Sequence, residues 1–332
     1  MQSKQIHSMP KECLYNISLI RMMATTSILV CHILQYYNNF LAWWFNAGVD
    51  VFLILSGYLY GIRSYSFTSL KECFDFCLKF YLKVFIKLLV PYYLILALMI
   101  PAYLVMGKID FGQIMRLCLF INPGVQGFGH VWYFIVIIIC YFVTPFWYFI
   151  PETKWKVFLL PCAILILMPF CGGNKIWYVC YLLGILIART RKFGKTRVVF
   201  DAVTIFLGLL FSVVCIYTCV ERTEWNILLN VQKLFMGGGI VILCMFFKGN
   251  CFNLIAKKIL DISDALSYKV FLIHPFFLSG ALCLMKIFER TWQNVVLCLT
   301  TTLVWSIVLH FSSEKIKLFF LKRERDKSKE CL

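Results

Sequence analysis

Residues 19–32 read LIRMMATTSILVCH, a stretch that puts two ionisable side chains inside the first long apolar run of the chain. A helix advances about 100° and 1.5 Å per residue, so the eleven-residue step from Arg21 to His32 is three turns plus about 20°. Both side chains therefore lie on one face of a helix, roughly 16 Å apart along its axis. Ionisable groups inside a membrane helix are energetically expensive, which makes both of them candidates for a function.

The composition predicts an all-α, polytopic membrane helix bundle. Of the 332 residues, 61% are hydrophobic and 15% are charged, and the mean hydropathy is +0.81. In soluble proteins only about half of the residues are apolar. The formal charge of +17 does not indicate a nucleic-acid partner, because the basic residues fall mainly in the breaks between apolar runs, as membrane orientation requires. Membrane lipid is the expected surrounding.

The sixteen cysteines do not predict a disulfide framework or a metal site. They are scattered, mostly within apolar runs, and form neither a CxxC pair nor a cluster with histidine at metal-ligand spacing. We expect them to act as small hydrophobic residues. The segment 1–12 is short and polar, so no cleavable signal peptide is expected and the first apolar run should remain as a span.

A membrane-spanning helix needs about 20 mostly apolar residues, and ten such segments are predicted. They are approximately 14–35, 41–62, 88–107, 129–150, 156–171, 174–189, 198–220, 226–247, 267–288 and 292–312.

The distribution of charge predicts that both termini are cytoplasmic. If the ten spans alternate from a cytoplasmic N-terminus, 24 lysines and arginines fall on the cytoplasmic side and six on the outer side. This asymmetry is the one that orients membrane proteins. We therefore expect a multi-pass protein of the cell membrane (plasma or inner membrane), with one transmembrane domain over 1–321 and a basic cytoplasmic tail over 322–332. The sequence does not indicate an oligomeric state.

Segment 70–87 carries lysines at 71, 79, 83 and 87, close to one face of a helix and separated by aromatic residues. Two interpretations are compatible with each other. One is an amphipathic helix that lies on anionic headgroups. The other is a basic wall at the mouth of a site for a phosphorylated ligand from the cytoplasm.

The second span contains Asp50, about two turns below its outer end, and His32 lies near the outer end of the first span. The two side chains are therefore expected at similar depth on adjacent helices. A carboxylate that accepts a hydrogen bond from one imidazole nitrogen makes the other nitrogen a better base. We interpret the pair as a general base with its orienting carboxylate, and a purely structural pair is the alternative.

Other polar residues of the spans have weaker signals. Arg21 either snorkels to the cytoplasmic surface or holds an anionic group that enters from there. His130 and Trp132 either contact a sugar on the outer side or belong to an interfacial aromatic belt. His274 is a buried ionisable residue before a proline, while Lys233 and His310 are isolated in the sequence and carry no prediction.

Five motifs together resemble the acyltransferase-3 family of integral membrane O-acyltransferases, in its stand-alone form. They are Arg21 with His32; Gly48, Val49, Asp50, Phe52, Ser56, Gly57 and Tyr58; Lys83 and Lys87 ahead of Pro91; His130, Trp132 and Tyr133; and Tyr268, Leu272, Ile273, His274 and Pro275. The family often has arginines where this chain has Lys83 and Lys87, and lysine lacks the bidentate fork that suits a phosphate.

The resemblance implies transfer of an acetyl group from cytoplasmic acetyl-CoA to a hydroxyl of a carbohydrate. It implies catalytic roles for His32, Asp50 and Arg21. Arg21, Lys83, Lys87 and Arg63 would bind the donor, and no metal is required. The implied acceptor site comprises His130, Trp132, Tyr133, Ser56, Tyr58 and His274. By analogy with the family, the acceptor is a cell-surface polysaccharide.

Two alternatives stay open at this point. One is a membrane transporter, because intramembrane charges also mark ion pathways; the chain, however, shows no inverted repeat and no matched pair of broken spans. The other is an acyltransferase that uses a different donor, such as succinyl-CoA.

Overall fold

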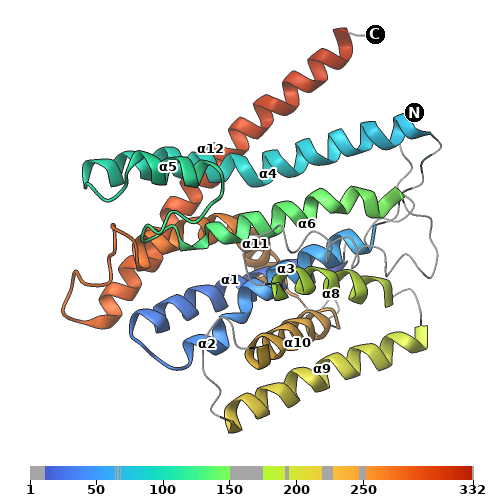
Figure 1. Ribbon diagram of the computed structural model, residues 1–332, viewed down its shortest axis with the longest axis horizontal. Coiled ribbons are helices and arrows are strands. Elements are labelled where there is room, and N and C mark those ends of the chain that lie inside the picture. Colours follow the sequence, from blue (N-terminus) through green and yellow to red (C-terminus); the bar gives the residue numbers. More distant parts are fainter. Residues whose placement is uncertain are drawn as a thin grey trace. The chain divides into compact units, whose positions relative to one another are not determined.

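The computed structural model describes residues 12–63, 65, 67, 69–149, 175–190, 194–218, 227–246 and 252–330. All the secondary-structure elements of these residues are helices (Figure 1). They are α1 (Glu12–Tyr36), α2 (Ala42–Phe45), α3 (Ala47–Gly61), α4 (Leu70–Val105), α5 (Phe111–Cys118), the 3₁₀ helix η1 (Gly129–Val131), α6 (Trp132–Phe149), α8 (Ile176–Thr190), α9 (Gly194–Tyr217), α10 (Ile227–Cys244), α11 (Leu254–Leu278) and α12 (Thr291–Glu330).

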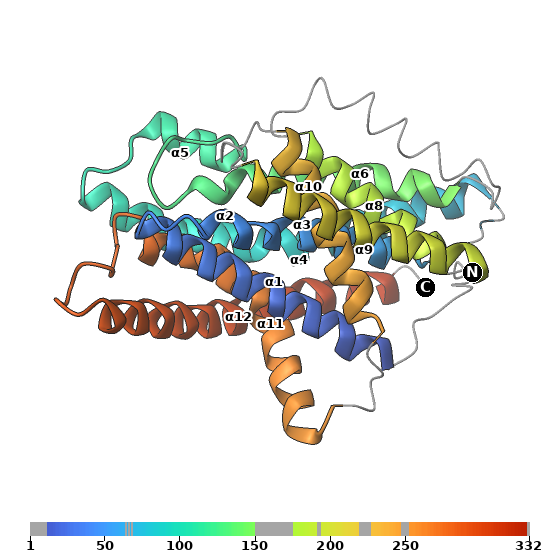
Figure 2. The ribbon, with the colours of Figure 1, turned by 90° about the horizontal axis from the view of Figure 1, so that it is seen from below.

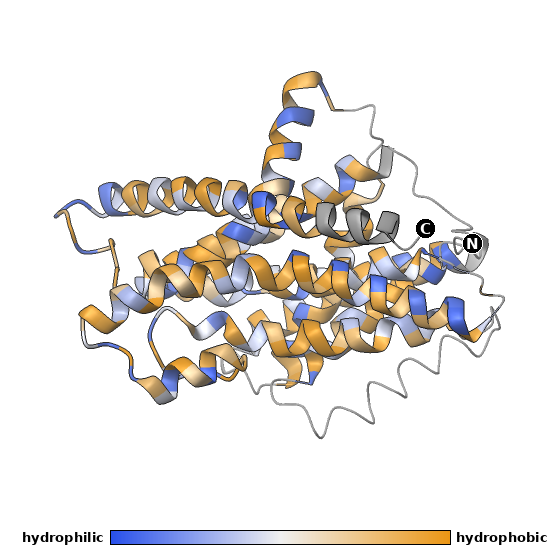
Figure 3. Ribbon diagram, turned by 90° about the horizontal axis from the view of Figure 1, so that it is seen from above, coloured by the Kyte–Doolittle hydropathy of each residue, from blue (hydrophilic) through white to orange (hydrophobic). Residues whose placement is uncertain are grey.

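The predicted all-α membrane fold is confirmed. Within the described residues, seven helical segments are long and apolar enough to cross a membrane, and α8 is a shorter apolar helix. Hydrophobic residues predominate along the helices in Figure 3. The total of ten spans and the side on which the termini lie stay predictions, and the fifth predicted span, 156–171, falls outside the described residues.

The chain divides into two compact units. Unit 1 comprises Met1–Cys77 and Ile135–Asp264, and unit 2 comprises Leu78–Phe134 and Ala265–Leu332. Each unit is therefore assembled from two separate parts of the sequence.

Helix α3 packs against four other helices of unit 1, namely α1, α2, α8 and α10. Figures 1 and 2 show α8 and α10 beside it. Its closest neighbour is α8: a Cβ built on Gly57 would lie 1.9 Å from the Tyr181 carbonyl oxygen, and one built on Gly184 would lie 1.9 Å from that of Ile54. Small residues permit this approach of two backbones in a membrane, where lipid offers no hydrophobic force to join helices.

Helix α1 runs antiparallel to α3, and Gly48 sets the register between them. A Cβ at Gly48 would lie 2.5 Å from the Ala24 carbonyl oxygen and 2.8 Å from Ile28 Cγ1. One turn nearer the connecting segment, the Ser27 hydroxyl donates to the Phe45 carbonyl oxygen at 2.6 Å. The height of every α3 side chain relative to α1 follows from these contacts.

Tyrosine hydroxyls connect the segments of unit 2. Tyr92 donates to the Leu117 carbonyl oxygen at 2.8 Å, and Tyr103 donates to the Gln126 carbonyl oxygen at 3.0 Å while accepting from the Ala281 backbone N–H at 2.9 Å. These bonds attach α4 to α5 and to the loops around it, because a buried backbone carbonyl needs a donor.

Helix α4 is longer than the predicted span 88–107. It begins at Leu70, so the basic segment 70–87 and the span form one continuous helix. Segment 70–87 contains no glycine or proline that would interrupt a helix. Pro91 and Pro101 lie inside α4 without ending it, as neighbouring groups in membrane bundles allow.

Helix α11 differs most from its prediction as a span over 267–288. It begins at Leu254, thirteen residues earlier, and ends at Leu278. The N–H groups of Ser279 and Gly280 both bond the Pro275 carbonyl oxygen, at 3.0 and 2.9 Å, and thereby close the helix. A Cβ at Gly280 would lie 2.5 Å from the Tyr103 hydroxyl, so the chain turns where only glycine fits.

Candidate active site

Asp50 lies in the first turn of α3 and is 3% exposed. The Cys180 thiol of α8 donates to its Oδ1 at 3.4 Å, and Lys233 of α10 interacts with it electrostatically. A buried carboxylate in a membrane protein needs such partners, because burial of an uncompensated charge is very costly.

His32 is half-buried near the end of α1, and its Nδ1 lies 2.8 Å from Oε1 of Gln35. An amide oxygen only accepts, so the contact places the ring proton on Nδ1 and makes Nε2 the basic nitrogen. Gln35 thus occupies the place beside the imidazole that the sequence predicted for Asp50.

A hydrogen bond between His32 and Asp50 was predicted, whereas the partners observed in the described structure are Gln35 for His32 and Cys180 for Asp50. Gly48 lies at the height of residues 24–28 of α1. Counting 1.5 Å per residue along both helices from that contact puts the backbones of His32 and Asp50 about 12 Å apart in height. The sequence identified two adjacent helices correctly and misjudged their register.

Arg21 forms an ion pair with Asp264, in which its Nη1 contacts Oδ1. The side chains are 23% and 34% exposed, respectively, and the pair joins α1 to α11 within unit 1. Asp264 was not predicted as a site residue. The available signal was the intramembrane arginine itself, which requires an anionic partner, together with the few acidic residues of this chain.

Ser56, Tyr58 and Arg63 follow Asp50 along the same chain segment. The Tyr141 hydroxyl donates to Ser56 Oγ at 3.4 Å, and Tyr58 is 3% exposed. The Arg63 guanidinium lies 5.3 Å from the centroid of the Tyr60 ring. A cation over an aromatic face at this distance gains a favourable interaction.

Three of the predicted acceptor residues gather in unit 2 around one ring, that of Phe271. Its centroid lies 5.7 Å from His130, 5.0 Å from Tyr133 and 6.0 Å from His274. His130 and His274 are 8% and 0% exposed. Trp132 is half-buried beside Tyr133, with ring centroids 6.2 Å apart. The structure therefore brings the motif that contains His130 and the motif that contains His274 together in unit 2. In the sequence they were two separate motifs.

Lys83 and Lys87 are exposed on α4, one turn apart on the same face. They also lie on the face that carries Lys79. The prediction of a basic helix face is therefore compatible with the structure, and donor binding there stays a prediction.

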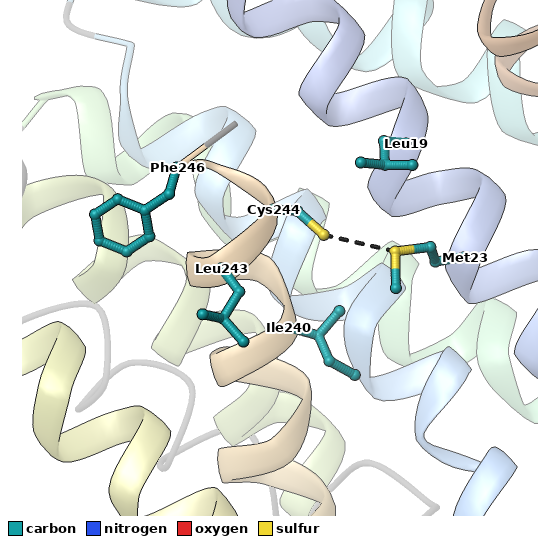
Figure 4. A pocket seen from close by; sticks show the side chains of 6 residues that line it. All are labelled: Leu19, Met23, Ile240, Leu243, Cys244 and Phe246. Atoms are coloured by element: carbon teal, nitrogen blue, oxygen red, sulfur yellow. Dashed lines mark hydrogen bonds between the residues drawn. The ribbon is translucent and has the colours of Figure 1, made fainter. Parts of the chain in front are cut away.

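An apolar cavity of about 670 Å³ lies between α1 and α10 of unit 1 (Figure 4). Its lining residues are Leu19, Met23, Ile240, Leu243, Cys244 and Phe246. Arg21 is two residues from both Leu19 and Met23, so it projects from about the opposite side of α1. The cavity is therefore separate from the polar residues described above.

Lys233 is the principal buried polar residue for which the sequence carried no prediction. It is 6% exposed, and its Nζ lies 5.4 Å from the centroid of the Trp43 ring.

Among the residues that the structure describes, no three His, Cys, Asp or Glu side chains lie close enough together to hold a metal ion.

Comparison with known proteins identifies the family. No curated protein and no solved structure matches the chain. The family model for acyltransferase 3, described as an acyltransferase domain, matches residues 14–311. The match extends from the first turn of α1 to the middle of α12 and therefore covers every candidate site residue named above. The chain belongs to the acyltransferase-3 family and is a membrane acyltransferase.

Proposed function

We propose that the protein transfers an acetyl group from cytoplasmic acetyl-CoA to a hydroxyl of a cell-surface carbohydrate, with His32 as the general base. The observation that carries this proposal is the family match over 14–311, taken together with a histidine whose basic nitrogen is defined by Gln35. An intramembrane imidazole of fixed tautomer is suited to proton transfer in a water-poor site.

In the proposed reaction, Nε2 of His32 removes the proton of the acceptor hydroxyl as its oxygen attacks the thioester carbonyl carbon. The tetrahedral intermediate then breaks its C–S bond, and the departing thiolate of coenzyme A takes the proton back from His32. General-base catalysis of this kind contributes about 10²–10⁴-fold to the rate. The developing oxyanion needs a donor, and Ser56 and Tyr58 are the candidates from α3.

The donor is expected to meet basic side chains, because coenzyme A carries several phosphate charges. We assign Lys83 and Lys87 to its nucleotide end, with Arg63 as a further contact, and Arg21 to the donor path. Charge-assisted bonds to phosphate support this assignment. The Asp264 carboxylate pairs with Arg21 in the structure, so an anionic donor at Arg21 would compete with it.

We assign the acceptor carbohydrate to His130, Trp132, Tyr133 and His274. The grouping of three of these side chains around Phe271 supports a common site. Aromatic and imidazole groups together offer stacking surfaces and hydrogen bonds for a sugar.

The test is acyl transfer by purified protein in lipid nanodiscs. Labelled acetyl-CoA is supplied with polysaccharide extracted from a strain that lacks the gene. Wild-type protein should label the polysaccharide, and His32→Ala should lower the rate by about 10²-fold or more. His310→Ala is the matched control, since that histidine lies on α12 outside the proposed site. Normal transfer by folded His32→Ala protein would refute the role of His32.

Three further measurements separate the alternative functions and identify the acceptor. Accumulation of solute in sealed vesicles without acyl transfer would indicate a transporter, which family membership disfavours. Labelled succinyl-CoA in place of acetyl-CoA measures the preference for the acyl group. Loss of an O-acetyl signal from the glycan NMR spectrum of the deletion strain would identify the acceptor.

A further inference from the structure

Lys233 is a buried cation of unit 1. It is 6% exposed, and it lies on α10, which packs against both α3 and α8. A charge in such a place is retained only where the surroundings compensate for it, and intramembrane charges of this kind are commonly functional.

The packing of α10 on α3 places Lys233 near the height of Asp50. A Cβ at Gly237 would lie 3.0 Å from Ile54 Cδ1 and 3.6 Å from the Val51 nitrogen, so this face of α10 meets α3. Lys233 precedes Gly237 by four residues, on the same face and about 6 Å nearer the start of the helix. That step leads toward Trp43, where Nζ lies 5.4 Å from the ring centroid, and it brings Lys233 within one turn of Asp50.

The surroundings of Lys233 are supplied by the other helices of unit 1. Among the residues that the structure describes, the titratable groups that interact with its charge are Asp50 of α3, Cys180 of α8 and Cys31 of α1. The Cys180 thiol also donates to Asp50. The carboxylate therefore has a hydrogen-bond donor from one helix and a cation from another.

We propose that Lys233 is a positioning residue of the acyl-transfer site, whose ammonium group compensates the Asp50 carboxylate and so holds α3, the helix that carries Ser56 and Tyr58, against α8 and α10. The inference rests on the proposed function, because Ser56 and Tyr58 of α3 are the proposed donors to the oxyanion. A carboxylate buried without a cation takes up a proton instead and loses its ability to orient its neighbours.

Four variants test the proposal in nanodiscs, with labelled acetyl-CoA and polysaccharide from the deletion strain. They are Lys233→Met, Lys233→Arg, Asp50→Asn and the double variant Asp50→Asn/Lys233→Met. Lys258→Met is the matched control, because Lys258 is an exposed lysine of unit 1. Rates are expressed per folded molecule, so that loss of protein is separated from loss of turnover.

We expect Lys233→Met to lower kcat about tenfold while the KM for acetyl-CoA stays within about twofold, because Lys233 acts through Asp50 on the position of α3 and its proposed oxyanion donors. Lys233→Arg keeps the cation and should retain most of the turnover. In the Asp50→Asn background, Lys233→Met should cause no further loss of kcat. Wild-type kcat per folded Lys233→Met molecule, or an equal further loss in the Asp50→Asn background, would overturn the proposal.

The amount of folded protein provides a second measurement. A single neutralisation leaves one buried charge without its partner, whereas the double variant removes both charges. If Lys233→Met is depleted from the membrane, the double variant should restore its level, and a level that stays low would refute the coupling to Asp50. The amount of folded protein does not depend on activity. A wild-type protein without acyl transfer would therefore refute the proposed function, while the levels of the single and double variants would still test the coupling between Lys233 and Asp50.

Discussion

At the residue scale, the proton on His32 is governed by Gln35, three residues further along α1. The imidazole donates from Nδ1 to Gln35 Oε1 at 2.8 Å. Replacement by leucine removes this acceptor and allows both tautomers of the ring. We expect Gln35→Leu to lower kcat about tenfold, since only one tautomer presents Nε2 as a base. Gln35→Glu keeps an acceptor at the same position and should preserve more of the activity.

The control for Gln35 is the His32→Ala background. In that background Gln35→Leu should have no further effect on the residual rate, because the two residues act as one unit. A Gln35→Leu protein with wild-type kcat would show that the contact does not set the tautomer that matters.

Single residues also show the limit of the sequence. The burial of Asp50 was predictable from an acidic residue in an apolar span. Its partners were not, because the register of α3 against α1, α8 and α10 depends on glycine contacts between segments far apart in the chain. For the same reason Lys233 looked isolated until the packing of α10 on α3 was known.

At the element scale, the contact between α3 and α8 depends on two glycines. A Cβ on Gly57 or Gly184 would lie 1.9 Å from a backbone oxygen of the facing helix, and a backbone cannot move aside as a side chain can. We expect Gly57→Ala and Gly184→Ala each to destabilise the protein by about 1–3 kcal/mol or more, as overpacking does. A lower midpoint of thermal unfolding in nanodiscs is the measurement.

Gly239→Ala on α10 is the matched control for these two variants. A Cβ there would meet Ile205 at 3.7 Å or more, which is ordinary van der Waals contact. Alanine also favours a helix over glycine, so this variant should be neutral or slightly stabilising. Equal unfolding midpoints for all three variants would show that α3 and α8 do not approach so closely.

The ends of elements were harder to predict than their existence. Hydrophobicity alone identified the spans that became α1, α6, α9 and α10. It misplaced α11, because the apolar residues after Leu278 lie in a turn that depends on Tyr103, more than 170 residues earlier in the chain. It also separated the basic segment 70–87 from α4, since hydropathy does not detect a helix that continues beyond its apolar part.

At the scale of the whole molecule, the direction of each helix follows from its neighbours and from the charges at its ends. In unit 1, α8 and α10 both run parallel to α3, as the successive contacts along them show. The predicted order of ten alternating spans requires the same direction for its second, sixth and eighth members. The common direction of these three helices therefore agrees with the predicted order, while the assembly of each unit from two parts of the sequence required tertiary contacts.

The orientation in the membrane is testable with reporter fusions. The predicted topology puts the segment between α4 and α5, which contains Lys108, on the outer side, and the end of α12 on the cytoplasmic side. A phosphatase fused after Lys108 should be active, because it folds only outside the cytoplasm, and a fluorescent protein fused after Glu330 should be fluorescent. The physical basis is the excess of lysine and arginine in the predicted cytoplasmic segments, 24 against six.

The same two reporters exchanged between the sites serve as controls and should both be inactive. Activity of the phosphatase after Glu330 would place the C-terminus outside and would require an odd number of spans or a reversed protein.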